Sequence, residues 1–305
     1  WHDREIRYRP SLDAETDCTK QRPRPKKAII MKSILITGCS SGIGLDSALA
    51  FRDAGWKVIA SCRKPADCAI MRDHHKIHSI CIDYEDEASI INGFAYALEF
   101  TDGHLDVLFN NGAYGIPALV EDLPTDALRA IFEANFFGWH TLSRLAIAQM
   151  RKQKQGRIIQ NSSVLGFAPL KFRGAYNATK FALEGLTDTM RLELHGTNIH
   201  LILVEPGPIR TRIRENAYIQ FKQWINWKGT ARESWYEEVA IPRLSAIDPP
   251  PDTFELMPVA VTKAVMHAAT AKRPKLRYRV TTATTLMMIL RRLLSSRAYD
   301  ALARR

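Results

Sequence analysis

Between residues 31 and 280, short apolar runs alternate with longer segments in which apolar residues recur every three or four positions. A short apolar run bounded by turn residues is typical of a buried strand, and the longer spacing is typical of an amphipathic helix. The pattern predicts strands over 34–36, 56–61, 77–82, 105–109, 157–160, 199–204 and 275–280. It predicts helices over 43–52, 88–100, 124–149, 174–194 and 258–271. Because strands and helices alternate, we expect an α/β fold: a doubly wound parallel sheet with helices on both faces.

The two ends of the chain depart from this central pattern. Residues 1–30 mix charged residues, prolines and polar residues without a sustained apolar period, so we expect a disordered or appended segment, with Met31 as the natural start. Residues 284–305 place leucines on one helical face and arginines elsewhere, which predicts a basic amphipathic helix. Its apolar run is far below the ~20 residues that span a bilayer. We expect it to dock on the protein or a neighbouring subunit, or to lie on an anionic membrane surface.

Composition and charge narrow the class of protein. A chain of 305 residues with 46% hydrophobic and 25% charged residues fits one large folded domain with extensions. The net charge of +11 lies in the tails, because residues 1–30 carry +3, residues 271–305 carry +9 and the remainder carries −1. A nearly neutral body argues against nucleic acid as a partner. The five cysteines form no C-x-x-C pair and no zinc spacing with histidine, so we expect no metal, no disulfide framework and reduced thiols in a cytoplasmic setting.

A glycine-rich turn follows the first predicted strand. From Thr37 to Gly44 the chain reads Thr-Gly-Cys-Ser-Ser-Gly-Ile-Gly and then enters the first helix. Glycines permit a tight turn and let the backbone approach a pyrophosphate, and the first N–H groups of the helix attract the anion. This arrangement is typical of dinucleotide binding in a Rossmann-type sheet.

A second group of candidate residues lies near the middle of the chain. Tyr176 and Lys180 are one helical turn apart and share a helix face, and Ser163 lies thirteen residues before the tyrosine. Because a lysine cation favours a neighbouring phenolate, we expect Lys180 to lower the pKa of Tyr176 toward neutrality. Such a pair can act as an acid or a base at neutral pH. A Tyr and a Lys four residues apart also occur by chance on many helices, so the pair gains weight from the glycine-rich turn.

With both motifs in this order, the chain resembles a classical short-chain dehydrogenase/reductase over roughly residues 31–280. The resemblance implies that NAD(P) lies on the glycine-rich turn and that Ser163, Tyr176 and Lys180 carry the chemistry. Asn135, in the segment Glu-Ala-Asn-Phe-Phe-Gly, matches the fourth catalytic residue of that family. The family segment Asn-Asn-Ala-Gly reads Asn-Asn-Gly-Ala at residues 110–113, with its last two residues exchanged.

The end of the second strand bears on the choice of cofactor. NAD-specific relatives place an acidic residue there, whereas this chain has Ser-Cys-Arg-Lys at residues 61–64. Arg63 can form charge-assisted bonds to a 2′-phosphate, so we expect NADP(H); the alternative is that Arg63 and Lys64 are solvated loop charges. The residues expected to hold the cofactor are Gly38, Ser40, Ser41, Gly42, Ile43, Gly44, Arg63, Lys64, Asp83, Asn110, Gly112, Tyr176, Lys180, Pro206, Gly207, Ile209 and Thr211.

Residues 212–251 lose the helical pattern and are rich in tryptophan, tyrosine and phenylalanine. Such side chains can wall an apolar pocket, so we expect a substrate lid here, although they could also simply cover the domain. The resemblance points to the branch that contains retinol and hydroxysteroid dehydrogenases and bacterial aldehyde reductases. It implies reversible hydride transfer between NADP(H) and an apolar aldehyde, retinoid or steroid-like substrate, in a homodimer or homotetramer. The alternatives are a catalytically silent NADP sensor and a protein that binds membrane surfaces through its tail.

Overall fold

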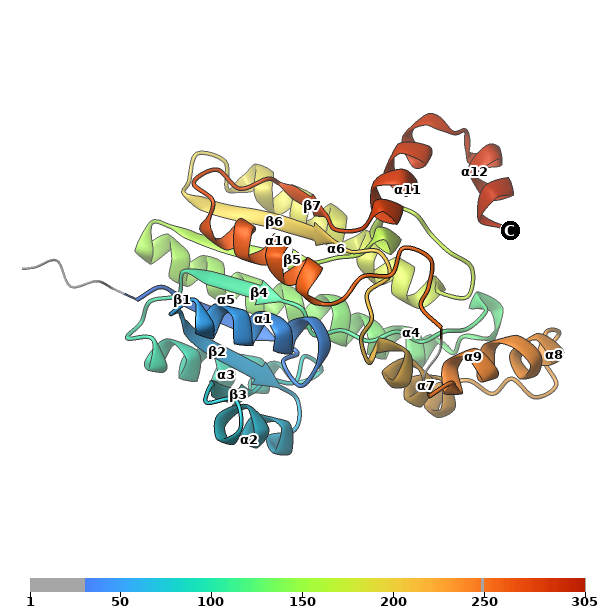
Figure 1. The fold of residues 1–305 in the computed structure, drawn as a ribbon, viewed down its shortest axis with the longest axis horizontal. Helices are drawn as coiled ribbons and strands as arrows, with labels where there is room; N and C mark the ends of the chain where they lie inside the picture. The colour runs from blue at the N-terminus through green and yellow to red at the C-terminus, as the bar shows by residue number, and fades with distance from the viewer. Residues whose placement is uncertain (1–30, 248–249, 305) are drawn as a thin grey trace, which may run out of the picture. The chain divides into compact units, whose positions relative to one another are not determined.

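The computed structural model describes residues 31–247 and 250–304. Seven parallel strands form one sheet in the order β3-β2-β1-β4-β5-β6-β7 (Figure 1). They are β1 (Ser33–Thr37), β2 (Lys57–Cys62), β3 (His78–Cys81), β4 (Val107–Asn110), β5 (Gly156–Asn161), β6 (Ile199–Glu205) and β7 (Arg277–Arg279). The predicted strands and the doubly wound parallel sheet are therefore confirmed.

Helices cover both faces of this sheet (Figure 1). The larger helices are α1 (Gly42–Asp53), α2 (Pro65–Asp73), α3 (Glu87–Phe100), α4 (Thr125–Phe132), α5 (Gly138–Gln153), α6 (Gly174–Glu193), α7 (Ile213–Trp224), α10 (Val259–Thr270), α11 (Thr282–Leu293) and α12 (Ser296–Ala303). Shorter segments are η1 (Val120–Asp122), η2 (Glu133–Phe137), η3 (Val164–Gly166), α8 (Glu233–Trp235), η4 (Tyr236–Ala240) and α9 (Ile241–Ser245).

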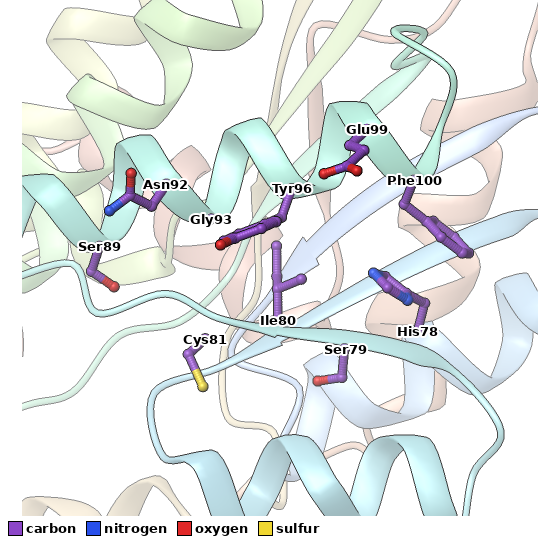
Figure 2. Close-up of a pocket in the computed structure, with 10 residues that line it drawn as sticks. All are labelled: His78, Ser79, Ile80, Cys81, Ser89, Asn92, Gly93, Tyr96, Glu99 and Phe100. Carbon is purple, nitrogen blue, oxygen red and sulfur yellow. The ribbon is translucent and has the colours of Figure 1, made fainter.

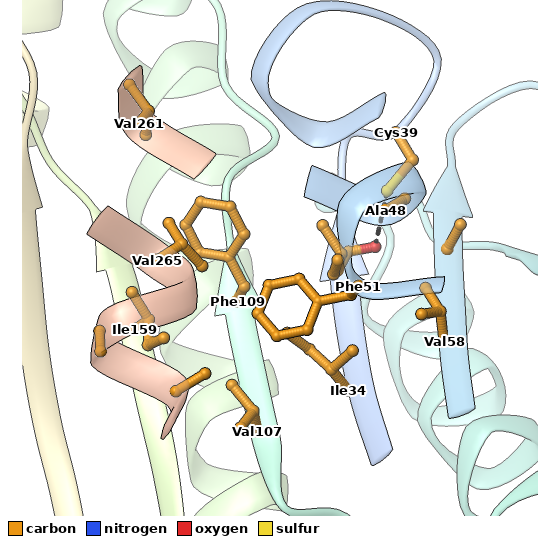
Figure 3. Close-up of a cluster of buried hydrophobic side chains, with 14 of the residues drawn as sticks. Ile34, Cys39, Ala48, Phe51, Val58, Val107, Phe109, Ile159, Val261 and Val265 are labelled. Carbon is orange, nitrogen blue, oxygen red and sulfur yellow. Dashed lines mark hydrogen bonds between the residues drawn. The ribbon is translucent and has the colours of Figure 1, made fainter. Parts of the chain in front are cut away.

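Two hydrophobic cores lie on opposite faces of the sheet. Because successive side chains of a strand point to opposite faces, Ile34 and Ile36 of β1 pack with α1, α2 and α10, whereas Leu35 packs with α3, α5 and α6. Figure 3 shows the first core, where Phe51 of α1 and Phe109 of β4 lie with side chains of α10. Both rings are fully buried, and burial of such a side chain contributes roughly 1.5–3 kcal/mol. This double burial explains why the strands read as continuous apolar runs.

Three segments differ from the sequence-based expectations. Helix α2 was not predicted, although Pro65 at its start and Asp67 in its first turn are typical helix-start residues. The single helix expected over 124–149 is interrupted by the π-helical segment η2. The single helix expected over 284–305 is two helices, because the chain turns at Leu294 and the Ser295 hydroxyl caps α12.

The C-terminal helix α12 turns back toward the body of the protein. Tyr299 is 2% exposed, and its hydroxyl donates to the carbonyl oxygen of Pro169 at 3.2 Å. Among the described residues, no helix is long and apolar enough to cross a membrane. The predictions for residues 1–30 concern a segment outside the described residues.

The strand order reverses beside β1, which has β2 on one side and β4 on the other. In open α/β sheets, ligands bind at this point, just beyond the carboxyl ends of the strands. The turns that follow β1, β2, β3 and β4 carry most of the residues expected to hold the cofactor, so the sheet topology brings them together.

Candidate active site

The glycine-rich turn lies against the turn that follows β4. Gly38 and Gly42 have φ angles of +68° and +57°, a conformation that favours glycine. A Cβ atom at Gly38 would lie 2.6 Å from the Cα atom of Gly112, and one at Gly44 would lie 2.2 Å from the carbonyl oxygen of Gly38. The missing side chains therefore let two stretches of backbone meet here, which leaves backbone rather than side chains facing the expected pyrophosphate position.

The start of α1 holds the other predicted residues of this turn. Ser41 caps α1 in an extended conformation, and its carbonyl oxygen accepts from the N–H group of Leu45 at 3.4 Å. Ser40 is exposed, and Ile43 is half-buried against the first core. This helix N-terminus can attract an anion.

Thr37, at the end of β1, holds the exchanged Asn-Asn-Gly-Ala turn in place. Its Oγ1 atom accepts from the N–H groups of Asn111 at 2.8 Å and Gly112 at 3.2 Å. The Tyr84 hydroxyl lies 2.7 Å from the same Oγ1 atom and 2.9 Å from Oδ1 of Asn110. A Cβ atom at Gly112 would lie 3.4 Å from the Tyr84 ring and 3.3 Å from Gly38, so the exchange to glycine gives room for the tyrosine.

The turn after β2 carries two exposed cations and faces the turn after β3. Arg63 and Lys64 are exposed, and Lys64 is the N-cap residue of α2. The Asp83 carboxylate accepts from the N–H group of Glu85 at 3.1 Å and so organises its own turn. Burial raises the pKa of Glu85, and the nearby Arg63 guanidinium lowers it. Arg63 therefore lies within electrostatic reach of acidic residues at the end of β3.

Ser163 and Tyr176 meet at the carboxyl end of β5. Ser163 is 8% exposed, and its Oγ atom accepts from the N–H group of Leu165 at 3.1 Å. Burial raises the pKa of Tyr176 well above its usual value, and a hydrogen bond with Ser163 lowers it by a smaller amount. The expected lowering of this pKa by Lys180 was wrong for this structure, because the lysine Nζ atom lies 5.5 Å from the tyrosine ring centroid and desolvation dominates.

Lys180 is 1% exposed and points into the protein. Its Nζ atom donates to the carbonyl oxygen of Asn161 at 2.8 Å and lies 4.2 Å from the centroid of the Trp139 ring. Trp139 is itself fixed, since its indole N–H donates to the carbonyl oxygen of Gly112 at 2.9 Å. Burial lowers the pKa of Lys180 to about 7, even though the nearby Glu184 carboxylate opposes this effect. The sequence-based interpretation missed Trp139, although it follows Asn135 by four residues on the same helical segment.

Asn135 lies in the π-helical segment η2 and is fully buried. Its Oδ1 atom accepts from the N–H group of Tyr114 at 3.1 Å, and its Nδ2 atom donates to the Tyr114 carbonyl oxygen at 2.8 Å. The side chain thus closes a two-bond pair with the loop that follows β4. A π-helical turn inside an α-helix frequently marks a functional position.

The Pro206-Gly207 turn follows β6 and contacts the segment after Ser163. The Pro206 carbonyl oxygen accepts from the N–H group of Val164, the residue after Ser163, at 2.8 Å. A Cβ atom at Gly207 would lie 2.2 Å from the Thr281 hydroxyl, so glycine lets α11 approach. Further along the turn, Ile209 pairs with Leu256 in a short parallel bridge.

Thr211 connects this turn to the glycine-rich turn. Its Cγ2 atom would lie 3.0 Å from a Cβ atom at Gly42. The cofactor residues expected at opposite ends of the sequence therefore approach each other.

Helices α7, α8 and α9 lie beyond the carboxyl ends of the strands (Figure 1), and aromatic residues of this segment form a small core. Phe221 of α7 and Tyr236 of η4 are fully buried, and Tyr176 packs against this cluster. The Tyr236 hydroxyl donates to Asp122 at 2.9 Å and accepts from the Leu119 N–H group at 2.9 Å. These contacts fasten residues 212–247 to the loop after β4.

The loop between Ser163 and Tyr176 also reaches this segment. Phe172 stacks on Trp235 of α8, with ring centroids 3.4 Å apart and an interplanar angle of 10°. Phe172 has a φ angle of +61°, which is uncommon for a residue with a side chain. The stacking therefore compensates for an unfavourable backbone conformation.

A separate groove of about 620 Å³ lies between β3 and α3 (Figure 2). It is lined by residues that include His78, Ile80 and Tyr96, and none of its lining residues belongs to the predicted site. Within residues 31–247 and 250–304, no group of His, Cys, Asp and Glu side chains is arranged to hold a metal ion.

Known proteins share both the sequence pattern and the fold. Residues 32–220 match the short chain dehydrogenase family. The chain is 37% identical over 272 residues to the oxidoreductase YbbO of Escherichia coli (strain K12), covering 89% of this chain and 94% of that protein. It is 29% identical over 254 residues to retinol dehydrogenase 8 of Homo sapiens, covering 81% and 80%.

Solved structures lead to the same family. A short-chain dehydrogenase from Streptomyces avermitilis superposes with a TM-score of 0.70 at 26% identity, covering 90% of this chain and 98% of that one. One from Burkholderia phymatum in complex with NAD has a TM-score of 0.72 at 21% identity, which bears on the fold alone. The chain belongs to the short-chain dehydrogenase/reductase family of oxidoreductases and resembles its retinol dehydrogenase branch.

Proposed function

We propose that this oxidoreductase uses NADP(H) to interconvert an apolar carbonyl compound and its alcohol, with Ser163, Tyr176 and Lys180 as catalytic residues and Asn135 in support. The observation that carries the proposal is the convergence of Ser163, Tyr176 and the buried Lys180 at the carboxyl end of β5. When bound, the nicotinamide would supply or accept the hydride.

Tyr176 is the proton donor in the direction of reduction. Because burial raises its pKa, the phenol stays protonated at neutral pH and can give its proton to a developing alkoxide. The Ser163 hydroxyl donates a second hydrogen bond to the same oxygen, which stabilises the negative charge that forms there. In the direction of oxidation, the same two groups accept and orient the alcohol.

Lys180 supplies positive charge beneath the tyrosine. Its Nζ atom lies 5.5 Å from the Tyr176 ring centroid, so its effect on the phenolate is secondary to that of burial. By resemblance to the family, Lys180 also holds the nicotinamide ribose. Asn135 supports a water path that returns a proton to the site, and we assign the water contact to its backbone carbonyl because its side chain is paired with Tyr114.

The residues of the glycine-rich turn fit a dinucleotide. The close approach of Gly38, Gly44 and Gly112 leaves a backbone cradle that any side chain would fill. The preference for NADP(H) is supported by Arg63 and Lys64 after β2, where an ion pair with a 2′-phosphate is available. Glu85 lies close enough to compete for Arg63, and we expect the phosphate to win because it carries the larger charge.

An apolar substrate is supported by the aromatic cluster that covers Tyr176. We assign residues 212–251 as the substrate lid, with Tyr114 and the rings of α7 to η4 as its apolar wall. The similarity to a protein named retinol dehydrogenase 8 favours an aldehyde, a retinoid or a steroid-like ketone.

We propose a homodimer or homotetramer in the cytoplasm, without nucleic acid as a partner. Peripheral membrane contact is supported by Leu286, Ile289 and Leu293, which are 46%, 42% and 77% exposed on α11 beside Arg291 and Arg292. Flotation with anionic vesicles, compared with a chain that ends at residue 283, tests this contact. Equal flotation of both chains would remove the tail from that role.

The catalytic proposal is tested by the loss of NADPH absorbance with medium-chain aldehydes, retinal and ketosteroids as substrates. NADH serves as the parallel cofactor, and Tyr176→Phe is the matched variant because it removes one hydroxyl. We expect turnover with NADPH that the variant loses. Binding of NADPH without turnover of any substrate would instead favour a catalytically silent NADP sensor.

A further inference from the structure

A cluster of ion pairs begins one helical turn after Lys180 on α6. Arg277 of β7 contacts three carboxylates that come from two other elements: Glu184 and Asp188 of α6, and Glu205 at the end of β6. Its Nη2 atom lies 2.7 and 2.6 Å from the two oxygens of Asp188, and its Nη1 atom lies 2.6 Å from Glu205 and also bonds Glu184. The side chains of Glu184 and Glu205 are buried, whereas those of Arg277 and Asp188 are 26% and 41% exposed.

This cluster touches both sides of the proposed active site. Glu184 follows Lys180 by one helical turn, so the two side chains share a face of α6. Glu205 immediately precedes the Pro206-Gly207 turn, whose carbonyl oxygen holds the segment after Ser163. The charge of Arg277 can therefore act on Lys180 through Glu184.

We propose that Arg277 and Glu184 are positioning residues for the reaction: Arg277 holds Glu184 as a carboxylate, and that carboxylate keeps the buried Lys180 ammonium charged and in place. The inference deepens the proposed function and rests on it. Neither residue needs to touch the substrate.

The electrostatics of the two buried groups support this chain of action. Burial and repulsion by Glu205 together raise the pKa of Glu184 to about 7, against the opposing effects of a hydrogen bond with Ser162 and of the Arg277 guanidinium. Burial lowers the pKa of Lys180 to about 7, even though Glu184 opposes this effect. Without Arg277, Glu184 would take up a proton more readily, and Lys180 would lose the negative charge that favours its protonated form.

The other groups around Lys180 cannot replace this carboxylate. From α6, Tyr176 and Glu184 are the titratable groups that face it, and the tyrosine is protonated at neutral pH. From α5 it meets the uncharged Trp139 ring, and from β5 it meets the Asn161 carbonyl oxygen. Within the described part of the chain, Glu184 is thus the anion that acts on the lysine.

The shape of arginine suits the role better than that of lysine. A planar guanidinium with five N–H donors can bond several carboxylates at once, whereas an ammonium is a compact point charge. At Arg277 the same group is shared by acids from α6 and β6, so it also fixes where Glu184 lies.

The test is a titration of Lys180 followed by NMR in protein labelled with ¹³C at the lysine ε-carbons. Lys180→Arg identifies the signal by its absence. We expect Glu184→Gln to lower the midpoint of the Lys180 titration by about one pH unit, as loss of a nearby opposite charge does. Arg277→Met should shift it in the same direction, and Arg277→Lys should restore part of the shift. Arg191→Met is the matched control, because Arg191 pairs with Asp188 at 2.7 Å and is about as exposed as Arg277.

Activity provides the second readout. If the midpoint moves from about 7 to about 6, the charged fraction of Lys180 at pH 8 falls about tenfold. As the pH is raised, we therefore expect kcat/KM for reduction to begin to fall at a lower pH in Glu184→Gln than in the wild type. An unchanged Lys180 midpoint in this variant, or lost activity with an unchanged pH profile, would overturn the inference. If Glu184→Gln shifts the Lys180 midpoint but the wild type turns over no substrate, the effect of Glu184 on Lys180 would be supported and the proposed function would be refuted instead.

Discussion

Tyr84→Phe removes one hydroxyl from the centre of the expected cofactor site and leaves the ring in place. The hydroxyl oxygen lies 2.7 Å from Thr37 Oγ1 and 2.9 Å from Asn110 Oδ1, so it joins the ends of β1, β3 and β4. A phenol has one proton to donate. We expect it to go to Asn110, because an amide oxygen cannot return a proton, whereas the Thr37 hydroxyl can.

The cost of the substitution follows from these partners. Asn110 is fully buried, and its Nδ2 atom already donates to Ser143 at 3.1 Å and Gln160 at 2.9 Å, so the amide cannot turn over without breaking those bonds. A buried oxygen left without its hydrogen-bond donor costs ~1–3 kcal/mol. Because the ring remains, no cavity forms. We expect a loss of about 2 kcal/mol in the free energy of unfolding, equivalent to ~4–8 °C in Tm.

Urea denaturation and thermal unfolding, each followed by circular dichroism, measure this change. The matched control is Tyr96→Phe, because Tyr96 is 62% exposed on α3 and a surface substitution of this kind usually changes stability by less than ~0.5 kcal/mol. Since Thr37 and Tyr84 hold the turn that carries Gly112, we also expect a higher KM for the cofactor in Tyr84→Phe. Equal stability of the two variants would refute the hydrogen-bond assignment.

Two further predictions concern the cofactor and the catalytic lysine. Arg63→Ala should raise the KM for NADPH by about tenfold or more through the lost charge-assisted bond and leave the KM for NADH nearly unchanged, whereas equal increases would mean that Arg63 does not read the 2′-phosphate. Lys180 has a pKa of about 7 in the folded protein, below its usual 10.5, so the unfolded chain binds more protons between these values and the free energy of unfolding should rise with pH. In urea denaturation we expect the free energy of unfolding to rise by about 1 kcal/mol per pH unit between pH 7 and 9. Lys180→Met should lose both this pH dependence and turnover. If the variant keeps the pH dependence, another group causes it.

The sequence alone determined the order of the strands along the chain and the place of each candidate residue at a strand end. Apolar runs such as Ile34 to Ile36 specify buried strands because both of their faces must be covered. The glycines at 38 and 44 also predicted a tight turn, and the structure adds that a side chain there would meet the backbone of Gly112 and Gly38. These features are local, so a single sequence carries them.

Contacts between distant segments were decided by the tertiary structure. Nothing in the sequence near Lys180 predicts that Trp139 lies over its ammonium or that Arg277, 93 residues beyond Glu184, pairs with that carboxylate. The expected effect of Lys180 on Tyr176 failed for the same reason, because the pKa depends on burial and on the distance between the two groups. These residues come from distant helices and strands, so they meet only when the helices pack on the sheet. Burial then shifts the pKa values of the titratable side chains, which a short sequence motif cannot predict.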